Sequence, residues 1–154
     1  MKQNRLLVLL AGLALALLPI IGCSGGGGAA KEPYADDSGK FVLREVTNPN
    51  DPDPFTLTAE GTFNEEGSLI ADATDQNNEI RYRIIASPMK LEPSKFLIQV
   101  MPKVLNVGYY KFYLEAEIDD GRSSKGSLVF KDTESRDGNG QLTGRKFSIT
   151  AEIW

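Results

Sequence analysis

The sequence predicts an all-β domain, an antiparallel β-sandwich of about eight strands, with a small closed β-barrel as the alternative. Three stretches of the chain alternate apolar and polar residues, as strands with one buried and one wet face do. Short turn sequences rich in Asp, Asn and Gly separate the stretches. No stretch keeps the 3.6-residue apolar period of a helix over a useful length, so helices are not expected.

The three clearest strands are expected at 55–63, 108–118 and 145–153. Each places its apolar residues on one face and its polar residues on the other. The inward sets are Phe55, Leu57, Ala59 and Phe63, then Tyr110, Phe112, Leu114, Ala116 and Ile118, then Phe147, Ile149, Ala151 and Ile153. Tyr109, Lys111 and Tyr113 fall on the polar side of the second strand.

Weaker apolar runs complete the count of strands, at 40–47, 68–74, 79–86, 95–101 and 124–131. Sharp turns are expected at 64–67, 75–78, 119–121 and 137–140. The proline-rich connector 48–54 must be an exposed loop, and 87–94 is a second long connection with room for a helical turn. The turn spacing and the proline-rich connector favour a sandwich over a barrel.

The first 22 residues have the features of a secretory signal. Lys2 and Arg5 precede an apolar run at 6–21, and the small residue Gly22 follows it. A membrane-spanning helix needs ~20 apolar residues, and this run is shorter and contains Pro19. Residues 1–22 are therefore expected to be removed from the mature protein.

The tetrapeptide Ile20-Ile21-Gly22-Cys23 resembles the lipobox of bacterial lipoproteins. The resemblance implies cleavage before Cys23 and attachment of acyl chains to that residue, which is the chain's one cysteine. Several acyl chains, at ~0.8 kcal/mol per buried methylene, hold a protein to a membrane permanently. In lipoproteins of Gram-negative bacteria an Asp after the cysteine favours the inner membrane. Ser24 stands here, so for a source with two membranes the resemblance points to the outer one.

Residues 23–39 are expected to form a Gly-rich flexible tether, followed by the β domain at 40–154. The tether contains four consecutive glycines and almost no apolar side chain, so it cannot offset the entropy cost of ordering. Loss of residues 1–22 removes Lys2 and Arg5 and no acid, which leaves 17 − 2 = 15 basic and 21 acidic side chains. Nothing in this balance attracts anionic lipids, so the acyl chains alone must hold the protein.

Composition excludes several classes of function. The chain has no histidine and one cysteine, which rules out a Ser/His/Asp centre, an imidazole metal ligand, an internal disulfide and a thiolate zinc site. The acidic balance argues against nucleic acid as a partner. Carboxylates gather in turns, where they stay hydrated and ionised, so we expect no enzyme, no catalytic residue and no cofactor.

A second resemblance covers residues 106–124. This segment, which begins Asn106-Val-Gly-Tyr-Tyr and ends in an Asp-Gly turn and a Ser-rich stretch, is similar to the late hairpin of bacterial immunoglobulin-like and fibronectin-like modules. The resemblance implies that Tyr110 is a corner tyrosine, whose hydroxyl bonds back to the chain. One further strand, at 145–153, departs from that pattern.

Two sets of side chains are candidates for binding. Asp132, Glu134, Asp137 and Asn139 could supply oxygen ligands to calcium, but Lys131 and Arg136 interrupt the run, and a mobile hairpin loop at 131–140 explains it better. Tyr109, Tyr113 and Trp154 fall on the polar sides of their strands, where exposed rings often bind a partner. Isolated surface aromatics are also common.

The expected function is that of a membrane-anchored lipoprotein whose domain is a non-enzymatic binding or assembly module of the cell envelope. Its partners would be the membrane, through Cys23, and an envelope protein. A calcium- or carbohydrate-binding surface domain is the alternative, followed by a small carboxylate-dependent hydrolase.

Overall fold

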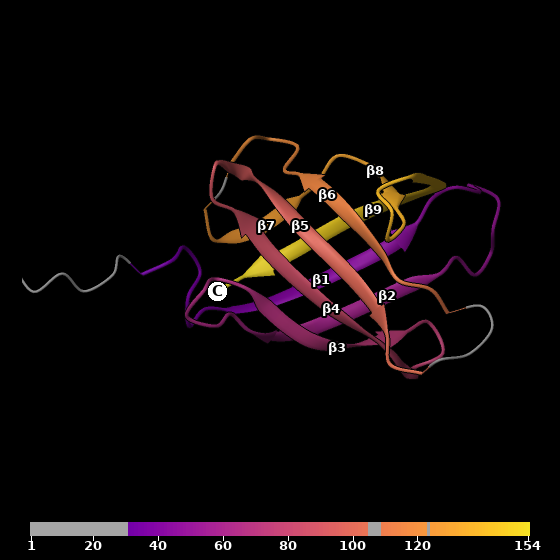
Figure 1. Ribbon diagram of the computed structural model, residues 1–154, viewed down its shortest axis with the longest axis horizontal. Helices are drawn as coiled ribbons and strands as arrows, with labels where there is room; N and C mark the ends of the chain where they lie inside the picture. The colour runs from indigo at the N-terminus through magenta and orange to yellow at the C-terminus, as the bar shows by residue number, and fades with distance from the viewer. Residues whose placement is uncertain (1–30, 105–108, 123) are drawn as a thin grey trace, which may run out of the picture.

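The structure, a computed structural model, describes residues 31–104, 109–122 and 124–154. In this part of the chain every regular element is a β-strand, and every pairing is antiparallel (Figure 1). The strands are β1 (Ser38–Glu45), β2 (Thr56–Thr62), β3 (Leu69–Asp75), β4 (Ile80–Met89), β5 (Glu92–Pro102), β6 (Phe112–Glu117), β7 (Gly126–Val129), β8 (Thr133–Arg136) and β9 (Leu142–Ile153). The all-β antiparallel prediction is confirmed.

The sheet closes into a barrel because its first and last strands pair. β1 aligns with β9 from Gly39 opposite Ile153 to Glu45 opposite Phe147. The other edge of β9 is shared, since β8 pairs with its first half and β7 with its second. Of the two architectures expected, the structure therefore has the closed barrel and not the two-sheet sandwich. Both bury one face of every strand, so alternation alone does not separate them, and closure pairs β1, which would be an edge of an open sheet, with β9.

Side chains fill the inside of the barrel. An eight-stranded barrel is just wide enough for its interior to be packed in this way. Its largest fully buried members are Phe41, Phe63, Phe96, Phe112, Phe147, Leu43, Leu57, Leu69, Ile84, Ile98, Leu114 and Ile118. The inward sets expected for β2 and β9, and for β6 from Phe112 onward, are confirmed by this burial. Phe112 and Phe147 stack at a centroid distance of 5.1 Å.

Two connections differ from expectation. β4 and β5 run into the segment 87–94, where Pro88 pairs with Phe96 and the register shifts at Met89. Such a bulge at a strand end tolerates proline, so a tight turn replaces the long connection. β8 lies within the expected loop at 131–140. Its polar sequence does not predict a strand, and pairing with β9 makes this segment a strand.

The folded region begins before Lys40, the boundary expected for the domain. Tyr34 and Ala35 are buried, and β1 starts at Ser38. The ring of Tyr34 lies 5.5 Å from that of Phe63 and 5.7 Å from that of Phe96, so it closes one end of the core. The signal segment and Cys23 lie outside the described residues. Within the described ranges, no helix is long and apolar enough to cross a membrane.

The four expected turns are present. Asn64, Asp75 and Asp137 each use a side-chain oxygen to accept hydrogen bonds from the backbone N–H groups two and four residues later. Gly67 and Gly140 follow with φ of 73° and 82°, a conformation that glycine adopts without strain.

Candidate binding site at the barrel mouth

The two ends of the barrel differ, and we name them the mouth and the base. The mouth comprises the end of β1, the start of β2, the β3–β4 turn, residues 109–111 and the start of β9. The base comprises residues 31–37, the β4–β5 turn and Trp154. In Figure 1 the base lies at the left, where the chain enters and ends, and the mouth lies at the right.

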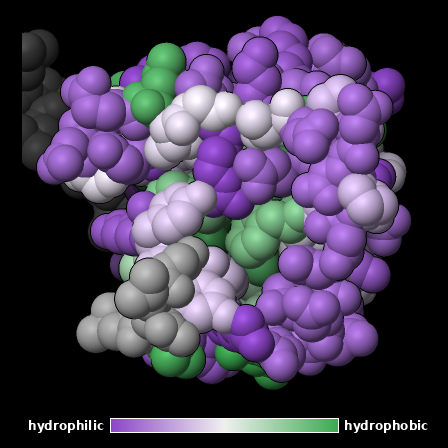
Figure 2. Space-filling view, turned by 90° about the vertical axis from the view of Figure 1, so that its right-hand side faces the viewer, coloured by the Kyte–Doolittle hydropathy of each residue, from purple (hydrophilic) through white to green (hydrophobic). Residues whose placement is uncertain are grey.

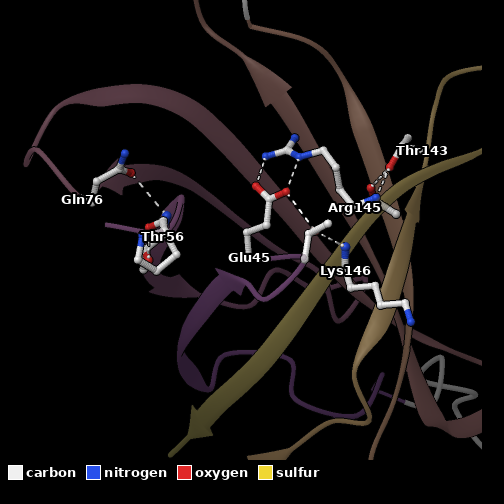
Figure 3. A network of polar contacts seen from close by, with 9 residues as sticks. Glu45, Thr56, Gln76, Thr143, Arg145 and Lys146 are labelled. Carbon is white, nitrogen blue, oxygen red and sulfur yellow. Dashed lines mark hydrogen bonds and ion pairs between the residues drawn. The ribbon is translucent and has the colours of Figure 1, made fainter. Parts of the chain in front are cut away.

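An ion pair surrounded by aromatic rings lies in the mouth. Arg145 donates through Nε to Glu45 Oε1 at 2.9 Å and through Nη2 to Glu45 Oε2 at 2.6 Å (Figure 3). Each of the two side chains is 20% exposed. The guanidinium carbon lies 5.0 to 5.3 Å from the centroids of four rings, those of Phe55, Tyr110, Phe112 and Phe147. Bidentate pairing and cation–π contacts both stabilise the charge of Arg145 at this depth.

Strand register places both partners. Arg145 continues the inward phase of Phe147 and Ile149 along β9, so its side chain enters the barrel. Glu45 ends β1, opposite Phe147. Thr47 accepts a hydrogen bond from the Lys146 backbone at 2.9 Å and donates to Glu45 Oε1 at 3.1 Å. The carboxylate is therefore held from two sides.

The pairing sets the charge states. The hydrogen bond from Arg145 holds the pKa of Glu45 below its ordinary value of 4.5, against the opposing effect of burial. Burial by itself would lower the pKa of Arg145, but the Glu45 carboxylate, together with Tyr110 and Tyr82, raises that pKa above its ordinary value. Both groups are therefore charged at neutral pH.

A second group of residues lies on the other side of the mouth. Arg81 donates a hydrogen bond to the Tyr109 hydroxyl, lies 5.4 Å from the centre of that ring and approaches Asp75 at 3.9 Å. Tyr109 packs edge to face on Tyr82 at 5.5 Å, and Tyr82 packs on Phe55 at 5.4 Å. Burial raises the pKa of Tyr82 to about 12.

These groups enclose a shallow pocket of about 170 Å³. Its lining comprises Phe55, Asp75, Gln76, Asn77, Arg81, Tyr82, Tyr109, Tyr110 and Arg145. Gln76 accepts a hydrogen bond from the Thr56 backbone at 3.3 Å through its amide oxygen. Its amide nitrogen and the Asn77 side chain have no partner in the described part of the chain. Figure 2 shows this end of the molecule, where a hydrophilic rim surrounds a hollow with apolar surface inside.

The three aromatic residues proposed from the sequence do not form one surface. Tyr109 reaches the mouth, but it packs against the core, whereas Tyr110 is 45% exposed. The expected phase of these two residues is wrong because β6 begins only at Phe112, and the alternation does not extend before it. Tyr113 lies on the outer wall between Gln99 and Arg136, and Trp154 lies at the base.

Two of the four calcium candidates, Asp137 and Glu134, use their carboxylates to hold the backbone. Asp137 Oδ1 accepts from Asn139 N at 2.8 Å and from Gln141 N at 3.0 Å, and Glu134 Oε1 accepts from Gly144 N at 2.8 Å. Asp132 is exposed just before β8. Over the described ranges, no group of three or more His, Cys, Asp or Glu side chains is close enough to hold a metal ion.

The sequence reasoning missed Arg145, Glu45, Arg81 and Gln76. One signal was available for Arg145, because extending the inward phase of Phe147 by two residues places a cation inside the core. No sequence pattern brings Glu45 to it, since 100 residues separate them and only the β1–β9 pairing joins them.

Comparison of the chain with protein-family models, with curated proteins and with solved structures finds no match. The side chains that line the mouth are therefore the basis for assigning its role. Exposed rings, amides and guanidinium groups around a hollow are typical of a binding surface, because aromatic side chains and arginine contribute most to recognition.

Proposed function

We propose that the protein is a lipid-anchored, non-enzymatic binding or assembly module of the bacterial cell envelope, and that the barrel mouth is its binding surface. One observation carries the proposal. The aromatic and guanidinium-lined mouth lies at the end of the barrel opposite residues 31–37, through which the chain leads back to Cys23. A barrel anchored at its base presents this surface to the envelope space.

The acid groups of the mouth support binding over catalysis. A general acid needs a carboxyl group that stays protonated near neutral pH, and the pKa of Glu45 is shifted in the other direction. Asp75 Oδ1 is occupied by the backbone N–H groups of Asn77 and Glu79. Both carboxylates hold structure in place.

The anchor is tested in cells that make the full chain. A clickable fatty acid should label the wild-type protein, and Cys23→Ala should abolish the label and release the protein from the membrane fraction. An unlabelled wild-type protein, together with unchanged fractionation of Cys23→Ala, would contradict the anchor.

The binding surface is tested by photo-crosslinking in the same cells. A photoreactive amino acid at position 110 in the mouth should give a defined adduct, and the same amino acid at position 113 on the outer wall should not. Adducts of equal yield from both positions, or from position 113 alone, would place the binding surface elsewhere.

A carbohydrate is the second candidate, as the ligand that the mouth binds. The observation that favours it is the combination of the exposed Tyr110 ring with the Gln76 amide nitrogen and the Asn77 side chain, which have no partner among the described residues. A ring face packs on the apolar face of a sugar, and amides bond to its hydroxyl groups. At about 170 Å³, the pocket is below the ~300 Å³ typical of drug-sized ligands, which suits a single sugar unit.

Binding to an array of bacterial envelope glycans tests this candidate. Tyr110→Ala should weaken any hit by ~10-fold or more, the loss expected of a central aromatic contact. Tyr113→Ala is the matched control and should leave binding unchanged. Equal losses from both variants, or no hit at all, would remove the carbohydrate candidate.

A further inference from the structure

The base of the barrel carries two exposed apolar side chains. Leu91 lies at the tip of the β4–β5 turn and is 97% exposed, the highest value among the large apolar residues described as exposed. Trp154 follows β9 and is 56% exposed. Because β4 and β5 lie across the barrel from β9 and β1, the β4–β5 turn and the end of β9 lie on opposite sides of the same rim (Figure 1).

The chain that leads to Cys23 leaves the barrel beside Leu91. Lys90 Nζ lies 2.8 Å from Glu32 Oε1, which joins the β4–β5 turn to the entering segment. Pro33, Tyr34, Pro88 and Met89 line a pocket of about 200 Å³ between them. From Glu32, nine residues lead back to Cys23, and at ~3.5 Å per residue they reach about 30 Å when fully extended. An anchor on Cys23 therefore keeps this end close to the membrane.

The cations around the base are paired with acidic side chains. Ion pairs join Lys31 to Asp36, Lys90 to Glu32, Lys95 to Glu92, Arg122 to Asp120 and Lys125 to Asp37. A polybasic surface that attracts anionic lipids would need cations without acidic partners. The charge pattern therefore suits a zwitterionic headgroup layer.

From this placement, we propose that the base of the barrel rests on the bilayer, with Leu91 and Trp154 in the headgroup region and the mouth directed away from the membrane. The inference rests on the anchor at Cys23 proposed above. Leucine gains by leaving water, and tryptophan favours the membrane interface, where its ring is shielded and its N–H stays solvated. Tethering makes the contact intramolecular, so two side chains suffice to orient the barrel.

The composition of the chain makes the contact measurable. The protein has one cysteine and one tryptophan, so Cys23 can be coupled to a maleimide lipid and Trp154 serves as the only tryptophan fluorophore. The chain from Cys23 to Trp154, which keeps every described residue, is coupled to zwitterionic phosphatidylcholine vesicles with or without brominated acyl chains. Brominated lipid quenches tryptophan only where the ring enters the bilayer.

Three single-tryptophan proteins are compared. The first is the wild type. The second carries Trp154→Phe with Leu91→Trp. The third carries Trp154→Phe with Leu142→Trp, a matched control because Leu142 is equally apolar and is exposed at the mouth end of β9. The first two should show blue-shifted emission and quenching by brominated lipid, and the third should show neither.

Two further measurements, the salt dependence of quenching and the effect of Leu91→Asp, test the same contact. Quenching of Trp154 should be the same at low and high salt, and Leu91→Asp should reduce it several-fold with no change in the far-ultraviolet spectrum. Absence of quenching in the first two proteins, or equal quenching in the third, would overturn the proposed orientation. Coupling is chemical, so this result does not depend on lipidation in cells. A failed fatty-acid label would contradict the anchor alone.

Discussion

At Arg145, strand alternation places a charged side chain inside the barrel, where a charge is unfavourable unless it is paired. Its place on the inward phase of β9 takes a charge into the barrel, where an unpaired ion costs several kcal/mol. Glu45 and four aromatic rings compensate this cost, and a 20% exposed side chain keeps partial contact with water. Removing either side chain therefore leaves the other charge half-buried and destabilises the fold.

Arg145→Met should lower the free energy of unfolding by about 2 kcal/mol, because it leaves the Glu45 carboxylate half-buried without its partner. Lys146→Met is the matched control on the wet face and should stay within about 0.5 kcal/mol. Denaturant melts measure both. Adding Glu45→Gln to Arg145→Met should recover part of the loss, and strictly additive losses would mean that the two side chains are not coupled.

The Glu45 carboxyl group also predicts a dependence of stability on pH. Its pKa is lower in the folded protein than the ordinary 4.5 of the unfolded chain, so folding favours the ionised form. Its contribution is fully present above pH 4.5 and is lost as the pH falls from there through the folded-state pKa. The difference in unfolding free energy between the wild type and Glu45→Gln should be constant from pH 5 to 8 and should shrink toward pH 3. A constant difference down to pH 3 would refute the assignment.

At the scale of the element, the position of β6 in the wall depends mainly on its inward side chains and on its pairing with β5. Phe112 stacks on Phe147 inside the barrel, whereas Lys111, just before the strand, is exposed. β6 pairs with β5 from Phe112 to Glu117 but meets β8 only at Tyr113. With few ladder pairs on that side, the inward side chains supply much of what holds β6 in the wall.

Phe112→Ala should cost about 3–5 kcal/mol through lost burial and the cavity that remains. Lys111→Ala should cost no more than about 0.5 kcal/mol, because it removes a solvated charge. Denaturant melts of the two variants separate these effects. A larger loss for Lys111→Ala would mean that the faces are assigned one residue out of register.

For the whole molecule, different contacts close the barrel wall and the base of the barrel. Pairing of β1 with β9 joins the two ends of the domain and closes the wall. Tyr34 covers the core at the base. The entering segment therefore belongs to the folded unit from residue 32 onward.

Tyr34→Ala should lower the free energy of unfolding by about 2–4 kcal/mol, since it removes a ring that is packed on two others. Lys31→Ala, three residues earlier and exposed, should have an effect within about 0.5 kcal/mol. Thermal or denaturant melts decide the point. A neutral Tyr34→Ala would return this segment to the flexible tether.

Local patterns in the sequence determined the fold class, the strand faces and the turns of this protein. Alternation at Leu57, Phe112 and Ile149 follows from the two-residue period of a strand, and the side chains of Asn64 and Asp137 bond their own turns. Each of these features depends on a few neighbouring residues, so the sequence alone specifies it. The signal segment at 1–22 and the lipidation of Cys23 stay predictions from the sequence pattern, because both lie outside the described residues.

Tertiary structure decided the architecture, the order of β8 and the mouth. A sandwich and a barrel require the same alternation, and they differ only in whether β1 meets β9, a pairing between strands about 100 residues apart. That pairing also brings Glu45 to Arg145, while β6 starts late, so that Tyr109 packs against the core and Tyr110 is 45% exposed at the mouth. Non-local strand pairing, which no short sequence window contains, is the physical reason that the candidate site could not be read from the chain alone.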